Sequence, residues 1–346
     1  MTVSIIIAVK AYCENLKECV NKCLELDSEA EDYEIIILPD SSFSAESFLS
    51  DPKIKIIPTG VVTPPKKRDI GAEAASGDIL AFLDDDTYPT KTWLKEAAKI
   101  FNEDTVIGCV CGPAITPKSD SILQKGSGLV YTSPLVSGNY GFRYIPGKRR
   151  EVRDFPSCNF LIKKDLFFAV GGFDKPFWPG EDTFLCLKVL GAGKTMVYSP
   201  KVLAFHHRRS LFKGHLDQIK SYALHRGYFA KKYPKTSLQI EYFIPSVFVA
   251  GLLAGSFLSL LFPLVKFFYT FISALYLTLV FGSSLILASE TKENCINKVK
   301  LFLFTIFGII ATHIAYGLYF IKGLWVKKMP EEARSSDMDR PISGRG

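Results

Sequence analysis

Apolar residues occur in two patterns along the first 110 positions of this chain. Continuous apolar runs, which are typical of buried strands, lie at residues 3–9, 33–38, 54–57, 79–83 and 106–111. Between these runs, apolar side chains recur with helical spacing at residues 13–26, 64–75 and 90–101. Because strands alternate with helices, we predict βαβ units, an α/β fold and a mainly parallel central sheet.

Residues 113–154 break this alternation. They are rich in Gly, Ser, Tyr and Pro, so we expect loops and short elements over the site. Regular elements resume with predicted strands at 157–162 and 195–198 and predicted helices at 163–170 and 183–190. Residues 211–233 have the spacing of an amphipathic helix, which could lie on a membrane surface.

Three long stretches without charged residues follow, at residues 242–265, 267–289 and 301–321. Each is long enough to cross ~30 Å of hydrocarbon as a helix. Buried core helices are the alternative, which three such stretches in succession disfavour. Three full crossings would place the tail after Ile321 outside the cell, whereas the Lys and Arg residues of that tail favour the cytosolic side. One stretch being re-entrant or interfacial therefore stays an open alternative.

Positive charge, +7 in total, gathers just before the first uncharged stretch. Such clusters attract anionic head groups and mark the cytosolic side, so nucleic-acid binding is the weaker interpretation. The chain enters its first strand without a basic leader, and its eight cysteines contain no C-x-x-C pair, which fits a reducing compartment. We predict a multi-pass protein of the cell membrane with a cytoplasmic globular domain.

The predicted organisation has four parts. They are a globular domain at 1–210, a basic juxtamembrane helix at 211–240, membrane helices within 241–322 and a disordered polar tail at 323–346.

Three consecutive carboxylates, Asp84, Asp85 and Asp86, follow the apolar run at 79–83. Carboxylates so close together repel one another, and a divalent cation is the usual partner that offsets their charge. Ligands of open α/β sheets bind at the carboxyl ends of strands. The pattern favours a metal and phosphate site over a solvated acidic turn.

Further candidate residues lie on either side of this triplet. Arg68, in the preceding helix, could pair with phosphate or with the aspartates, and Lys66 and Lys67 beside it suggest a solvated face as the alternative. His206 and His207 follow a strand, and either could ligate a cation or touch a phosphate.

A second acidic element, Glu181-Asp182, stands at the start of a predicted helix. Asp182 could act as a general base toward an acceptor hydroxyl, or simply as a helix cap. Trp178 just before it could stack on a sugar ring or pack in the interior. The sequence motifs of ATP hydrolysis and NAD binding are absent. Gly193-Lys194-Thr195 ends like a phosphate loop, but Lys188 stands where that loop needs its first glycine. No G-x-G-x-x-G motif for NAD follows the first strand.

Taken in order, these segments resemble glycosyltransferase family 2, the inverting GT-A type with a membrane anchor found in bacteria. The matching segments are residues 3–9, 34–42, 67–71, 77–86, 158–160, 171–174 and 180–182. The resemblance implies a GT-A domain that binds a nucleotide sugar, with C-terminal transmembrane helices behind it.

The resemblance also implies roles for particular residues. It assigns Mg²⁺ or Mn²⁺ to Asp84 and Asp86 and the catalytic base to Asp182. From its position after a strand, we predict His206 as a further metal ligand. The donor-binding positions that the resemblance implies are Ala8, Asp40, Arg68, Asp84 and Asp85. The acceptor or loop contacts that we predict are Trp178, Glu181 and Asn159.

The chain departs from the family pattern at several positions. Ala8 replaces a usual Pro, Cys13 an Asn, Pro39 an acidic residue and Asp69 a usual Asn. The Q-x-x-R-W signature of processive synthases is absent, which favours single sugar addition.

The function expected is therefore metal-dependent, inverting transfer from a nucleotide sugar to a membrane lipid or lipid-linked saccharide in cell-surface glycan synthesis. A polyprenyl-phosphate glycosyltransferase and a non-catalytic membrane scaffold with the same fold are the alternatives.

Overall fold

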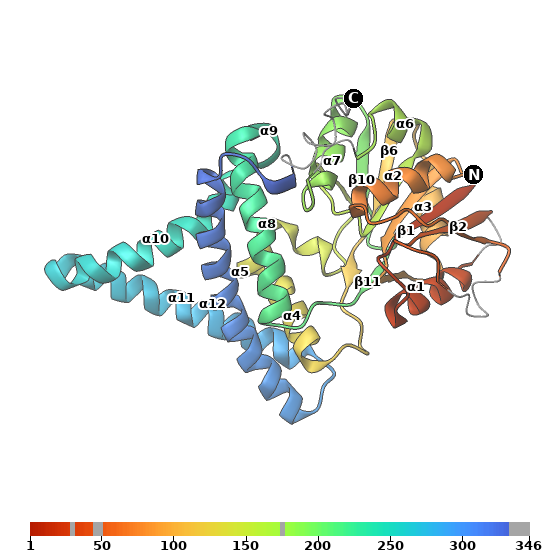
Figure 1. Ribbon diagram of the computed structural model, residues 1–346. Helices are drawn as coiled ribbons and strands as arrows, with labels where there is room; N and C mark the ends of the chain where they lie inside the picture. Colours follow the sequence, from red (N-terminus) through yellow and green to blue (C-terminus); the bar gives the residue numbers. More distant parts are fainter. Residues whose placement is uncertain (28–31, 44–50, 174–176, 332–346) are drawn as a thin grey trace, which may run out of the picture. The chain divides into compact units, whose positions relative to one another are not determined.

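The structure, a computed structural model, describes residues 1–27, 32–43, 51–173 and 177–331 (Figure 1). Chain contacts divide them into two compact units. The first contains the described residues of 1–115, 145–206 and 328–331, and the second contains residues 116–144 and 207–327. Asp174 of the predicted 171–174 motif and the predicted disordered tail from 332 onward lie outside the described residues. The domain limits expected from the sequence stay predictions.

An eight-stranded mixed sheet forms the centre of the first unit, as far as that unit is described. Its strands, in the order β3-β2-β1-β4-β9-β6-β10-β8, are β1 (Val3–Ala8), β2 (Tyr33–Leu38), β3 (Ile54–Ile56), β4 (Ile79–Asp84), β6 (Ile107–Cys111), β8 (Arg150–Glu151), β9 (Asn159–Lys163) and β10 (Thr195–Tyr198). β1 lies parallel between β2 and β4, whereas β9 runs antiparallel between β4 and β6. The α/β fold with a mainly parallel sheet is confirmed.

Helices pack on this sheet because its central strands are apolar on both faces. The helices of the first unit are α1 (Glu14–Leu24), α2 (Pro64–Ala74), α3 (Trp93–Phe101), α6 (Lys164–Ala169) and α7 (Glu181–Gly191). Side chains of β1, such as Ile5, Ile6 and Ile7, are fully buried, as strands covered on two sides require. This buried centre fixes the strand ends that carry the polar residues.

A small second sheet stands at the carboxyl edge of β4. Its order is β5-β11-β7, with β5 (Thr87–Pro89), β11 (Ala204–His206) and β7 (Ala114–Ile115). β11 pairs antiparallel with β5 so that His206 lies opposite Thr87. This pairing brings His206, which lies far from the aspartate triplet in the sequence, next to Asp86 in the structure.

The second unit is helical throughout its described residues. Its helices are α4 (Ile122–Thr132), α5 (Pro134–Ser137), the 3₁₀ helix η2 (Gly138–Arg143), α8 (Lys213–Lys232), α9 (Pro234–Ser237), α10 (Ile240–Leu261), α11 (Pro263–Glu290) and α12 (Cys295–Trp325). The loops expected over 113–154 are wrong for α4, which begins with a capping box between Ser121 and Gln124. By length and composition, α10, α11 and α12 could each cross a membrane.

Candidate active site

Asp84 is the last residue of β4 and lies in register beside Ala8, the last residue of β1. Both side chains are partly exposed at the carboxyl edge of the sheet, where polar groups can meet a ligand. The predicted donor position Ala8 therefore lies next to the first carboxylate of the triplet.

Asp84, Asp86 and His206 converge at this edge. Each offers one ligand atom, and these atoms all lie within 4.8 Å of one another. His206 Nε2 lies 3.2 Å from Asp86 Oδ1, and both side chains are partly exposed. Carboxylate oxygens and an imidazole nitrogen are a donor set that suits Mn²⁺, and the oxygens suit Mg²⁺. The three residues predicted as metal ligands are thus together and could hold a divalent cation.

Asp85 points elsewhere. Its Oδ2 accepts a hydrogen bond from Cys13 Sγ at 3.7 Å, at the residue that precedes α1. Burial, together with the charges of Asp86 and Asp84, raises the pKa of Asp85 to about 6. The alternation of directions leaves Asp84 and Asp86 as the pair that faces His206, and the donor contact predicted for Asp85 stays a prediction.

Arg68 joins the triplet to the second acidic element. This α2 side chain is 4% exposed, and its Nη2 donates to Asp84 Oδ1 at 2.6 Å while its Nη1 donates to Glu181 Oε1 at 2.9 Å. Burial opposes the charged guanidinium, but Asp84 and Glu181 outweigh it and raise the pKa of Arg68. The buried guanidinium of Arg68 therefore holds the end of β4 and the start of α7 together.

Lys67, beside Arg68, is the residue that the sequence interpretation missed. The solvated helix face considered for it is wrong, because Lys67 is 3% exposed. Its Nζ contacts Asp40 Oδ1 at 2.5 Å, and it donates to the carbonyl oxygens of Val9 at 2.7 Å and Leu38 at 3.1 Å. The ammonium thus gathers the ends of β1 and β2 and orients Asp40, the predicted donor residue.

The Glu181-Asp182 pair begins α7, after Gly180 in a left-handed conformation with φ of +117°. Burial and the adjacent Asp182 carboxylate raise the pKa of Glu181, while Arg68 opposes that rise. Glu181 is 5% exposed and bonded to Arg68, and the acceptor or loop contact predicted for it stays a prediction. Asp182 is partly exposed, and Gly180 rather than Asp182 occupies the cap position.

Two other predicted acceptor or loop residues have opposite surroundings. Trp178 is 48% exposed, so the interior packing considered for it does not occur. Asn159 is fully buried: its Nδ2 donates to the carbonyl oxygens of Gly112, Pro113 and Val202 at 2.8–3.2 Å. This amide joins chain segments inside the domain, and the acceptor or loop contact predicted for Asn159 stays a prediction.

Comparison with known families agrees with this arrangement. The family described as "Glycosyl transferase family 2" matches residues 4–171, which contain β1 except its first residue, the strands from β2 to β9 and the aspartate triplet. The chain belongs to glycosyltransferase family 2.

Two curated relatives show how far the likeness extends. The family 2 chain is 28% identical over 152 residues to the pre-mycofactocin glycosyltransferase of Mycobacterium tuberculosis, covering 42% of this chain and 30% of that protein. It is 23% identical over 221 residues to the glycosyltransferase AglE of Haloferax volcanii, covering 60% of this chain and 67% of that protein. The chain thus spans less than a third of the first relative.

A solved structure shares the fold. It is the mannosyltransferase PcManGT from Pyrobaculum calidifontis in complex with GDP-Man and Mn²⁺, with a TM-score of 0.53 and 16% identity over 94% of this family 2 chain and 88% of that one. The likeness supports a GT-A-like domain followed by apolar C-terminal helices.

Proposed function

We propose that this chain is a metal-dependent, inverting glycosyltransferase that moves a sugar from a nucleotide-sugar donor to a membrane-associated acceptor, in the form of a lipid-linked saccharide. The observation that carries the proposal is the convergence of Asp84, Asp86 and His206, linked through Arg68 to the start of α7. Family membership and the Mn²⁺ and GDP-Man named for the structural relative support it.

The proposed chemistry assigns separate tasks to the two acidic elements. Asp84, Asp86 and His206 would hold the cation, whose charge would stabilise the leaving diphosphate. Arg68 keeps Asp84 oriented, and Lys67 keeps Asp40 oriented at the neighbouring strand end. Asp182 takes the proton from the acceptor hydroxyl while the hydroxyl oxygen bonds to the anomeric carbon and the bond from that carbon to the nucleoside diphosphate breaks. Because the hydroxyl attacks the face opposite the leaving diphosphate, the anomeric centre inverts.

Asp84→Asn tests the metal assignment in the full chain. We expect the loss of Mn²⁺ binding, measured by electron paramagnetic resonance, and the loss of sugar transfer from a panel of nucleotide sugars. Asp78→Asn is the matched control, because Asp78 precedes the same strand at its other end and binds Thr2 instead. Unchanged Mn²⁺ binding in Asp84→Asn would contradict the site.

Asp182→Asn separates the two catalytic alternatives. Loss of a positioned base costs about 10²–10⁴-fold in kcat, which we expect with a hydroxyl acceptor. A polyprenyl-phosphate acceptor is already an anion, so near-full transfer by this variant would favour that second function. A purified chain that neither hydrolyses nor transfers any donor would support the scaffold alternative.

A further inference from the structure

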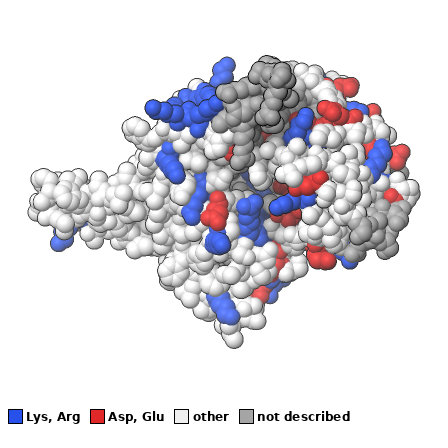
Figure 2. All heavy atoms as spheres, in the orientation of Figure 1, with Lys and Arg blue, Asp and Glu red and all other residues white. Residues whose placement is uncertain are grey.

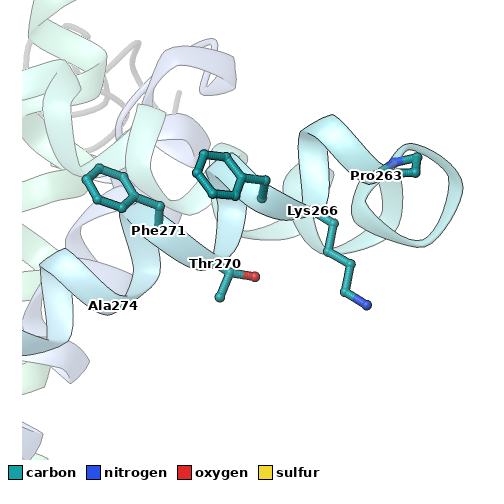
Figure 3. Close-up of a pocket in the computed structure, with 6 residues that line it drawn as sticks. Pro263, Lys266, Thr270, Phe271 and Ala274 are labelled. Atoms are coloured by element: carbon teal, nitrogen blue, oxygen red, sulfur yellow. The ribbon is translucent and has the colours of Figure 1, made fainter.

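Charged side chains have very different surroundings in different parts of this chain. Figure 2 shows α10 and α11 almost without them, and Figure 3 shows Lys266, which is the only Lys, Arg, Asp or Glu between residues 242 and 289, extending from α11. In the first unit two opposite charges are instead buried, since the side chains of Arg68 and Glu181 are 4% and 5% exposed and form an ion pair. Apolar residues often replace such a pair without loss of stability, so stability alone does not account for it.

Arg68 is shared between Glu181 and the candidate cation site. Its Nη2 donates to Asp84 Oδ1 at 2.6 Å, and its Nη1 donates to Glu181 Oε1 at 2.9 Å. Its Nε is buried without a hydrogen-bond partner among the described residues. The guanidinium therefore directs its two terminal nitrogens at two carboxylates, of which Asp84 belongs to the group that could hold a cation and Glu181 does not.

Apolar rings confine the guanidinium of Arg68 on its other side. Its Cζ lies 5.7 Å from the centre of the Phe173 ring, and this ring packs against those of Phe82 and Phe167 with centres 5.3 and 5.6 Å away. Arginine is not deprotonated in proteins, so burial does not remove its charge. The positive charge of Arg68 therefore stays beside Asp84 when a cation binds there.

This fixed charge opposes the binding of a cation. Arg68 alone would neutralise Asp84 and leave Asp86 as the uncompensated carboxylate of the group formed by Asp84, Asp86 and His206. Repulsion between the guanidinium and a divalent cation is strong in a partly buried site, where the effective dielectric constant is about 20. Glu181 places a second negative charge on the other nitrogen of the guanidinium and so offsets this repulsion.

We propose that Glu181 is a positioning residue of the cation site, which holds and neutralises Arg68 so that Asp84 keeps its negative charge for a divalent cation. Glu181 does not itself contact the cation in this arrangement. Because Glu181 is the first residue of α7, the same contact fixes the start of the helix that carries Asp182, the proposed base. The inference rests on the cation site of the proposed function, and it assigns that site a supporting residue.

Mn²⁺ titration of the purified full chain in detergent, followed by electron paramagnetic resonance, tests this role. The titration is done at pH 8, at which Glu181 is ionised even though burial and Asp182 raise its pKa. Glu181→Gln keeps the shape of the side chain and removes its charge, so we expect Mn²⁺ to bind at least about tenfold more weakly. Glu181→Asp keeps the charge and should retain most of the affinity.

Two further variants separate the charge of Glu181 from its part in the fold. Glu34→Gln is the matched control, because it removes a carboxylate that pairs with Lys55 at the opposite end of the sheet, and it should leave Mn²⁺ affinity unchanged. Adding Arg68→Met to Glu181→Gln removes both buried charges. We expect this double variant to bind Mn²⁺ as tightly as the parent or more tightly, since the charge that Glu181 offsets is gone.

Circular dichroism of each variant shows whether it is folded before the titration. Parental Mn²⁺ affinity in Glu181→Gln would overturn the inference, and so would a folded double variant that binds no more tightly than Glu181→Gln. Either result leaves the cation site of the proposed function intact, whereas a parent that binds no Mn²⁺ overturns both. If the double variant does not fold, the comparison of Glu181→Gln with Glu181→Asp decides, and equal affinities of these two overturn the inference.

Discussion

Glu34 holds several chain segments together at the end of the sheet opposite the candidate site. Its Oε1 accepts from Ser4 Oγ at 2.7 Å, from Ser76 N at 2.6 Å and from Ser76 Oγ at 2.7 Å. Its Oε2 lies 2.6 Å from Lys55 Nζ, and the Glu34 side chain is 12% exposed. The carboxylate therefore joins β1, β2, β3 and the segment before β4 in one ionised network.

This network makes stability depend on the charge of Glu34. Burial alone would raise the pKa of Glu34, but Lys55, Ser4 and Ser76 outweigh burial and lower it from 4.5 to about 2. A shift of that size corresponds to about 3 kcal/mol. Because the Lys55 side chain is 51% exposed, solvent screening reduces the expected contribution to about 1–2 kcal/mol.

The sign follows from linkage. The unfolded chain binds a proton at Glu34 more readily than the folded chain, so the stabilisation is present above pH 4.5 and is lost as the pH falls toward 2. Glu34→Gln removes the titration while it keeps an oxygen in place of Oε1. We expect this variant to be about 1–2 kcal/mol less stable than the parent at pH 7, with a smaller difference at pH 3.

Urea unfolding of the full chain in detergent, followed by circular dichroism, measures the stability difference between the parent and Glu34→Gln at pH 7 and at pH 3. The exposed Glu73 on α2 provides the control substitution, Glu73→Gln. If parent and Glu34→Gln lost stability in parallel between pH 7 and pH 3, the reasoning from the network would be refuted.

Three further predictions concern buried contacts, each measured by chemical denaturation of the full chain. Arg68→Met should cost about 3 kcal/mol, because Glu181 stays buried without its partner, and adding Glu181→Leu should restore part of the loss; no cost would contradict the link. Burial, aided by Arg208, lowers the pKa of His215 from 6.5 to about 4, so the parent should lose stability as the pH falls through that interval. His215→Gln should abolish this slope, and a retained slope would assign it to another group. Gly323→Val should cost at least about 1–3 kcal/mol by forcing α8 away from α12, whereas Gly282→Ala, with nothing within 4 Å, should cost less; equal effects would argue against the close packing.

The sequence predicted the central strands because burial on both faces leaves a clear pattern. The run before Asp84 became β4, and its place in the sheet put the carboxylates at the strand end where ligands bind. His206 was predicted beside them from its position after a strand, and the structure brings it to Asp86. The pattern of apolar and polar residues was sufficient to predict an element wherever a single segment of the sequence formed it.

The pairing of strands that lie far apart in the chain could not be predicted from the sequence. β5 and β11 have three residues each and β7 has two, which is too short for any periodicity to show. The burial of Lys67 and Asn159 depends on strand ends that meet only in the folded domain. α4 is different, since the Ser121-x-x-Gln124 capping box was present in the sequence and could have revealed it.

The position of His206 along the chain orders events during synthesis. Asp84 and Asp86 leave the ribosome long before β11 does, and β11 ends at His206 whereas the first apolar helix, α10, begins at Ile240. Since domains fold as their residues emerge, the three side chains that could hold a cation come together only after β11 has been made. A nascent chain that stops before Ala204 carries the two carboxylates and no histidine, so the proposed cation site would be completed only late in the synthesis of this unit.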